Sequence, residues 1–106
     1  MLSADFLSLD RRRAAAEALI ASDSAGDAWD AVSKLDQLGL DSAQMLSSVT
    51  NALVHPSENV RAKAAETLGQ LGPAARPALP QLRALRQDEW KMVRDAVEAA
   101  LPKIGE

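Results

Sequence analysis

The sequence contains no cysteine and no tyrosine, and it has one phenylalanine and one histidine among its 106 residues. The lack of cysteine excludes disulfides, thiolate metal sites and a cysteine nucleophile. A single histidine leaves no material for a catalytic triad or a histidine-rich metal site. Because strand-forming residues are scarce while alanine, leucine and glutamate are abundant, the composition favours helices nearly throughout the chain.

The chain also lacks the glycine patterns of nucleotide-binding and hydrolase sites. Neither GxxxxGK[ST], nor GxGxxG, nor Gly-x-Ser-x-Gly occurs. Acids cluster at Asp27, Asp30, Asp36 and Asp41, but a solvated helix face explains such a cluster more often than metal binding or acid-base chemistry. The arginine run at 11–13 is interpreted in the same way, with binding of phosphate or an acidic partner as the alternative. We therefore predict no catalytic, metal or cofactor site.

Length and composition indicate one folded domain, residues 1–106. Hydrophobic residues make up 47% and charged residues 25%, as in an ordinary globular protein. The N-terminus places acids ahead of its basic run and has no long apolar segment, so it resembles neither a signal peptide nor a membrane span. A net charge of -3 without a broad cationic face disfavours nucleic acid as a partner. We expect a cytoplasmic protein with no membrane association.

Two segments of the sequence match each other at a constant offset of 33 residues. They are "ENVRAKAAETLGQLG" at 58–72 and "WKMVRDAVEAALPKIG" at 90–105, and "SKLDQLG" at 33–39 is a more diverged third copy. A constant period of this size indicates stacked helical units, because one helical pair cannot bury its own apolar face. The sequence thus predicts three hairpins, or six helices, in repeats of about 8–39, 41–72 and 74–105.

The apolar spacing identifies the core face of each helix. In the best copy the residues on one face are Val60, Ala64, Leu68 and Leu71. Gly72 can adopt the left-handed conformation at a helix end, and Pro73 discourages continuation. The next arm carries a second apolar stripe, formed by Ala78, Leu79, Leu82 and Leu85. Pro80 removes a backbone donor and should bend this helix.

The stretch "RPALPQLRALRQDEWKMVRDAVEAALPKIG" resembles the HEAT repeat, especially the short form named after phycobilisome lyases. The resemblance is good over 41–105 and weak over 1–40, where Asp27 and Ala28 replace a Val-Arg pair. It implies an all-α fold, an α-solenoid with a right-handed superhelical stack. It also implies inner helices at about 27–38, 57–71 and 89–104.

The family pattern also places an aspartate in the turn between helices and an arginine six residues later, which can form a polar ladder between repeats. Asp88 and Arg94 match both positions, whereas His55 and Arg61 match only at the arginine. The resemblance therefore implies a contact of Asp88 with Arg61, and we expect both arginines to be structural. His55 is expected to be a local cap or an exposed side chain instead of a general base.

The two tryptophans are predicted to differ in their surroundings. Trp90 lies at the start of the last helix and is expected to point toward the apolar side. Trp29 falls on the side of its helix that should face solvent, where an exposed tryptophan requires an explanation. A binding role and cover by Leu2, Phe6 and Leu7 remain equal alternatives.

The function predicted from these features is a non-catalytic interaction module or scaffold that binds a protein or peptide, of unknown identity, on its inner helices. The candidate binding face consists of Trp29, Ser33, Gln37, Lys63, Glu66, Gln70, Asp95 and Lys103. Trp29 would be its anchor, because aromatic residues at interface centres contribute strongly to binding.

Three further possibilities remain open. The resemblance suggests a protein related to chromophore lyases, in which the attached cysteine belongs to the substrate. A nucleic-acid-binding HEAT-like protein is disfavoured by the charge balance. Self-association through the last hairpin is a third possibility, since solenoid ends normally need capping.

Overall fold

The computed structural model describes residues 11, 14–22, 24–35 and 42–105, and these residues contain helices and no strand. Residues 14–20 are helical. The helices that follow are α2 (Ala25–Lys34), α3 (Ser42–Ala52), α4 (Glu58–Leu71), α5 (Leu79–Ala84) and α6 (Lys91–Ile104). Within the described part of the chain, no helix combines the length and apolarity needed to cross a bilayer. The all-α prediction is confirmed.

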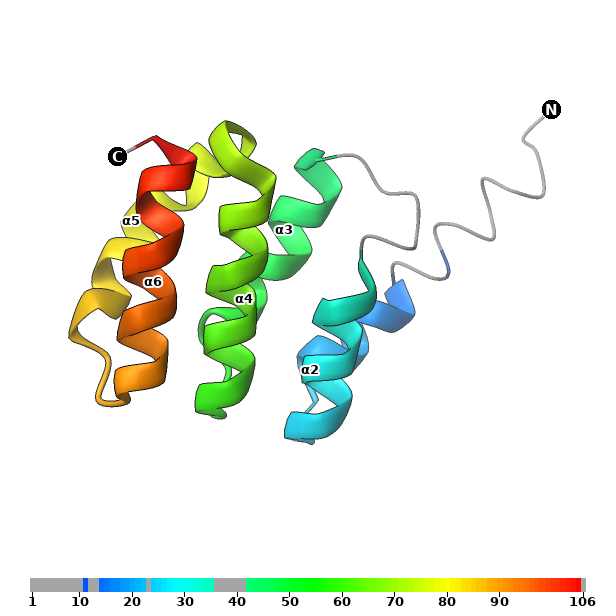
Figure 1. Cartoon of the computed structure of the whole chain (residues 1–106). Helices are drawn as coiled ribbons and strands as arrows, with labels where there is room; N and C mark the ends of the chain where they lie inside the picture. Colours follow the sequence, from blue (N-terminus) through cyan, green and yellow to red (C-terminus); the bar gives the residue numbers. More distant parts are fainter. Residues whose placement is uncertain (1–10, 12–13, 23, 36–41, 106) are drawn as a thin grey trace, which may run out of the picture.

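The helices form two layers. Figure 1 shows α2, α4 and α6 in one row, with α3 and α5 behind them. The central helix α4 packs most extensively against α6, and it also contacts α2 and α3. This arrangement of neighbouring hairpins is that of an α-solenoid, and it places α2, α4 and α6 in the inner layer that the sequence predicted.

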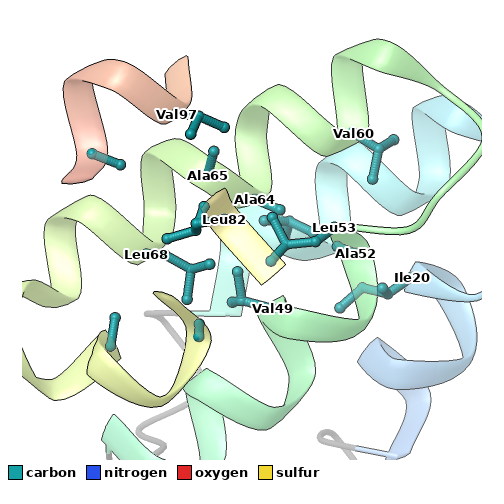
Figure 2. Packing of buried hydrophobic residues seen from close by; sticks show 14 of the residues in the cluster. Ile20, Val49, Ala52, Leu53, Val60, Ala64, Ala65, Leu68, Leu82 and Val97 are labelled. Atoms are coloured by element: carbon teal, nitrogen blue, oxygen red, sulfur yellow. The ribbon is translucent and has the colours of Figure 1, made fainter. Parts of the chain in front are cut away.

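The core is one apolar cluster built around α4 (Figure 2). Val60, Ala64 and Leu68 are fully buried, as their spacing predicted. Leu71, predicted to belong to the same stripe, is only half-buried. The reason is its place in the last turn of α4, where it borders a groove. The outer layer contributes buried residues such as Leu82 of α5.

Glycines end two of the inner helices, at Gly72 as expected and at Gly105, which lies 33 residues later. α4 is followed by Gly72 with φ 63°, and α6 by Gly105 with φ 119°. Both values lie in the region that residues with a Cβ rarely adopt, so glycine is the residue that permits each helix end. The positions of both helix ends could therefore be predicted from the sequence.

The arm before α6 differs from the prediction of one bent helix. It consists of a 3-10 segment (Gly72–Ala78), the short helix α5 and a second 3-10 segment (Leu85–Gln87). Pro77 lies within the first 3-10 segment, whereas Pro80 lies in the first turn of α5. A proline in the first turn of a helix costs little, because the backbone N–H that it lacks would have no partner there. The departure from α-helical geometry therefore lies in the 3-10 segment before α5, and Pro80 itself causes no bend.

The link that the resemblance implied between Asp88 and Arg61 is present. Arg61 Nε donates to Asp88 Oδ2 at 2.9 Å, and Arg61 Nη2 donates to Asp88 Oδ1 at 3.2 Å. Oδ1 also accepts from the backbone N–H of Trp90 at 2.9 Å. Burial by itself raises the pKa of Asp88, but these hydrogen bonds and the charges of Arg61 and Arg94 outweigh it and lower the pKa. The ion pair joins the second and third hairpins.

His55 links the first and second hairpins in a different way. Its Nδ1 accepts from the backbone N–H of Ser57 at 3.0 Å, so Nε2 carries the proton and donates to the carbonyl of Ser22 at 2.7 Å. The side chain is 5% exposed. The predicted capping role is confirmed, but the alternative of an exposed side chain is wrong, because the turn at Ser22 covers the ring.

Candidate binding face of the inner helices

Three residues of the predicted face meet where α2 lies beside α4. The Lys63 Nζ lies 5.2 Å from the centroid of the Trp29 ring, within the range of a cation–π interaction. The same Nζ lies 3.9 Å from Glu66 Oε2. Trp29 is nevertheless 43% exposed, so part of its surface stays accessible to a ligand. The structure therefore brings an exposed aromatic ring and a lysine together from two adjacent repeats.

A groove of about 280 Å³ adjoins this contact and involves α2, α3 and α4. The described residues that line it are Val32, Ser33, Met45, Lys63, Thr67, Gln70 and Leu71. Ser33, Lys63 and Gln70 had been predicted as binding residues. Three residues of the predicted face therefore belong to one concave surface, and Trp29 contacts one of them, Lys63, from outside the groove.

The polar groups of the groove have defined hydrogen-bonding roles. Ser33 Oγ donates to the carbonyl of Trp29 at 2.9 Å, and Thr67 Oγ1 donates to the carbonyl of Lys63 at 2.9 Å. Each hydroxyl has one hydrogen, so both oxygens can only accept from a bound molecule while these bonds persist. The Lys63 ammonium and the Gln70 amide supply donors. The groove can thus satisfy donors and acceptors at the same time.

The predicted residues of α6 lie outside the groove. Asp95 is exposed and accepts from Lys91 Nζ at 2.8 Å on the same helix. Lys103 is exposed and extends beside Gly69 of α4. Gln37 falls outside the described residues, as do the N-terminal residues considered as a cover for Trp29. The described face therefore divides into a groove on α2 and α4 and a charged surface on α6.

The sequence favoured a core or an end-packing role for Trp90, and the core position is wrong, because Trp90 is 48% exposed. It precedes α6 as the N-cap residue, with extended backbone angles (φ -99°, ψ 125°). A residue in this conformation does not follow the helical periodicity on which the prediction depended.

The described acids of the N-terminal cluster are exposed. Asp30 forms an ion pair with Lys34 at 2.9 Å, one turn away on α2. Asp27 lies in the first turn of α2, where a negative charge is favourable. Asp36 and Asp41 fall outside the described residues. Among the residues that the structure describes, no group of three histidine, cysteine or acidic side chains is placed to hold a metal ion.

Four groove residues were not predicted as binding residues, namely Val32, Met45, Thr67 and Leu71. Thr67 lies one helical turn after Lys63, on the same side of α4, and this spacing was an available signal. Met45 comes from the outer helix α3, where the sequence indicated only a core residue. Nothing in its spacing indicates that it reaches the inner layer.

Comparison with known proteins gives one match. A family model for HEAT repeats matches residues 9–102. No curated protein and no solved structure matches the chain. The matched range includes α2 to α5 and all of α6 except its last two residues. It concerns HEAT repeats in general, so the short form named after phycobilisome lyases stays a prediction.

Proposed function

The chain belongs to the HEAT repeat family, and from this premise we propose that it is a non-catalytic interaction module. Its inner helices bind a segment of another protein, and the module acts as a scaffold without making or breaking bonds. Repeats of this family commonly serve as protein-interaction scaffolds. The proposal keeps the cytoplasmic location that the sequence predicts.

The observation that carries this proposal is the exposed Trp29 ring beside a groove. An aromatic anchor near a concave surface is typical of the residues that dominate protein interfaces, where one such residue contributes about 2 kcal/mol or more. Lys63 is held against the ring and lines the groove, so the two features act on one ligand. Helices also hold both features rigidly, which lowers the ordering cost of binding.

The dimensions and charges of this face favour a protein segment over the other two candidate ligands. Sites for small molecules usually enclose about 300 to 1,000 Å³, and the groove of about 280 Å³ suits single side chains better than an open-chain tetrapyrrole. Two further lysines of the inner helices form ion pairs, Lys34 with Asp30 and Lys91 with Asp95. Such pairing leaves no continuous cationic track for a phosphate backbone.

A displayed random peptide library would test the proposal without assuming a ligand sequence. Peptides selected on the protein should bind Trp29→Ala, which removes the aromatic ring, and Ser33→Trp, which fills the groove, more weakly, while the helical circular dichroism signal is retained. Gln81→Ala on the exposed surface of α5 is the matched control and should bind as the parent does. If the selected peptides bind all three variants equally, the function does not reside on the inner helices.

A further inference from the structure

We infer that the bound segment is recognised through an acidic side chain next to a large apolar side chain, with the carboxylate on Lys63 and the apolar group in the groove. This inference rests on the proposed function and specifies the chemistry of its partner. It concerns the groove between α2 and α4, which we call the Lys63 groove.

Lys63 gives the groove its charge preference. It is the only charged side chain among the described residues that line the groove. Its distance of 3.9 Å to Glu66 exceeds hydrogen-bond length, whereas Lys34 and Lys91 reach their acidic partners at 2.9 and 2.8 Å. The ammonium group therefore keeps donors for a ligand. The Trp29 ring attracts the cation through its face, which positions the ammonium without forming an N–H···O bond.

The apolar lining defines the second part of the recognised segment. Val32, Met45 and Leu71 contribute the hydrophobic surface, and methionine adapts readily to ligands of different shape. The volume of about 280 Å³ exceeds the about 150 Å³ of an engineered protein cavity that binds benzene. One leucine, methionine or phenylalanine side chain fits this space, and its burial supplies affinity that an exposed ion pair alone does not.

The hydroxyl groups favour a polypeptide over a free phosphate. Ser33 and Thr67 line the groove, and their hydroxyl oxygens can only accept, because their own hydrogens are bonded to helix carbonyls. A peptide backbone offers N–H groups to such oxygens, whereas a phosphate dianion offers further acceptors and is repelled. A peptide therefore offers a group to each side of the groove: its side-chain carboxylate accepts from Lys63, and its backbone N–H groups donate to the hydroxyl oxygens.

Short peptides with blocked ends test this recognition directly. The probes are acetyl-Gly-Leu-Glu-Ala-Gly-amide, its Glu-Leu isomer, and the matched peptides with glutamine or lysine in place of glutamate. Binding is followed by NMR through the indole N–H signal of Trp29, with the indole of Trp90, which does not line the groove, as an internal reference. At least one of the two glutamate peptides should bind about fivefold more tightly than the matched glutamine peptide. This is the gain expected from one partly buried charge-assisted hydrogen bond.

Substitutions then assign the preference to the groove. Lys63→Gln should abolish the difference between the glutamate and glutamine peptides, and Lys63→Arg should retain it. Gln70→Glu adds a negative charge to the lining at an exposed position and should weaken the glutamate peptide selectively. Lys91→Gln, which removes a lysine outside the groove, is the control for overall charge and should change nothing.

Several results would overturn the inference. They are no binding by either glutamate peptide, equal binding of glutamate and glutamine peptides, and an equal effect of Lys91→Gln and Lys63→Gln. A preference for a free terminal carboxylate over the side chain, measured with acetyl-Gly-Leu-Ala, would also contradict it. Should library-selected peptides still depend on Trp29 in any of these cases, the proposed function stands and only the acidic specificity is wrong.

Discussion

Three side chains spaced 33 residues apart perform the same local task with different chemistry. Ser22 Oγ, His55 Nδ1 and Asp88 Oδ1 each accept from the backbone N–H two residues further on, at 3.1, 3.0 and 2.9 Å. Asp88 also receives the Arg61 guanidinium from the preceding hairpin. The position equivalent to Arg61 in the first hairpin is Ala28, so an aspartate at 55 would lack this partner. His55 accepts from the backbone without needing a cationic partner, and its second ring nitrogen donates to the carbonyl of Ser22.

This compensation predicts a coupled pair of substitutions. Ala28→Arg places a guanidinium at a buried site, and His55→Asp leaves a buried carboxylate without a cationic partner, so each should destabilise the protein by about 1 to 3 kcal/mol. The double variant recreates the pair of Arg61 and Asp88 one repeat earlier and should recover part of the loss. Urea unfolding of all four proteins measures the coupling, expected at about 0.5 to 3 kcal/mol. Additive losses would show that the two positions do not communicate.

Asp88 should make the stability depend on acid pH. Its folded-state pKa is below the ordinary value of 3.8, so the ionised form contributes stability that is complete above the unfolded-state pKa. That contribution is lost as the pH falls through the lower folded-state pKa. Thermal unfolding of Asp88→Asn should therefore show a lower midpoint at neutral pH and a smaller decline in acid than the parent.

The matched control for this pH prediction is Asp30→Asn, because Asp30 belongs to an exposed ion pair on α2. Exposed pairs contribute little, so this variant should follow the parent at every pH. A parent-like acid profile for Asp88→Asn would show that the ion pair with Arg61 contributes nothing to folding.

The close packing of α4 on α6 depends on Gly69. A Cβ built on Gly69 would lie 3.1 Å from both the Cα and the Cβ of Ala100, so α6 would have to move by a few tenths of an ångström. Gly69→Ala gains about 1 kcal/mol of helix propensity, which offsets this strain, and the net change should be within about 1 kcal/mol. Gly69→Val adds bulk that cannot be accommodated and should destabilise by about 2 kcal/mol or more. Chemical denaturation of both variants checks this difference, and a neutral Gly69→Val would mean that the helices are packed less closely.

The fold could be predicted from the sequence where buried residues recur at the regular spacing of a helix. The apolar stripe of α4 and the glycines after α4 and α6 are recorded in the sequence at fixed spacing, and both predictions were correct. The arm at 72–87 was harder, since the effect of Pro80 depends on where the helix begins. Trp90 was misplaced for the same reason, because a cap residue does not share the helical phase.

The candidate site could be predicted only in part. Ser33, Lys63 and Gln70 were found because they lie opposite the apolar stripes of the inner helices. Met45 was missed because its contribution depends on how α3 packs behind the inner layer, which no spacing within α3 encodes. The concavity of the face is likewise a property of three helices together and not of any one segment.

At the scale of the whole molecule, the outward side of α6 differs from the side of α4 that packs on α6. The period of 33 places Glu98 and Pro102 where α4 has Ala65 and Gly69. Both residues of α6 are exposed, and Glu98 Oε1 accepts from Arg86 Nε at 3.1 Å. The small residues that allow α4 and α6 to approach closely are therefore absent from this side of α6.

This difference argues against self-association of the last hairpin in the register of the repeat. Suppose that the first hairpin of a second copy stacked on α6 in the way that the third hairpin stacks on α4. Arg94 would then occupy the position of Arg61, and it would face Ser22 instead of the carboxylate that Asp88 offers to Arg61. In the same arrangement Pro102 would face Lys34, whereas the equivalent residue of α4, Gly69, faces Ala100. Neither contact reproduces the charge pairing or the close approach of the native interface. We therefore predict a monomer by light scattering across the accessible concentration range, and a concentration-dependent mass that Arg94→Ala abolishes would contradict this prediction.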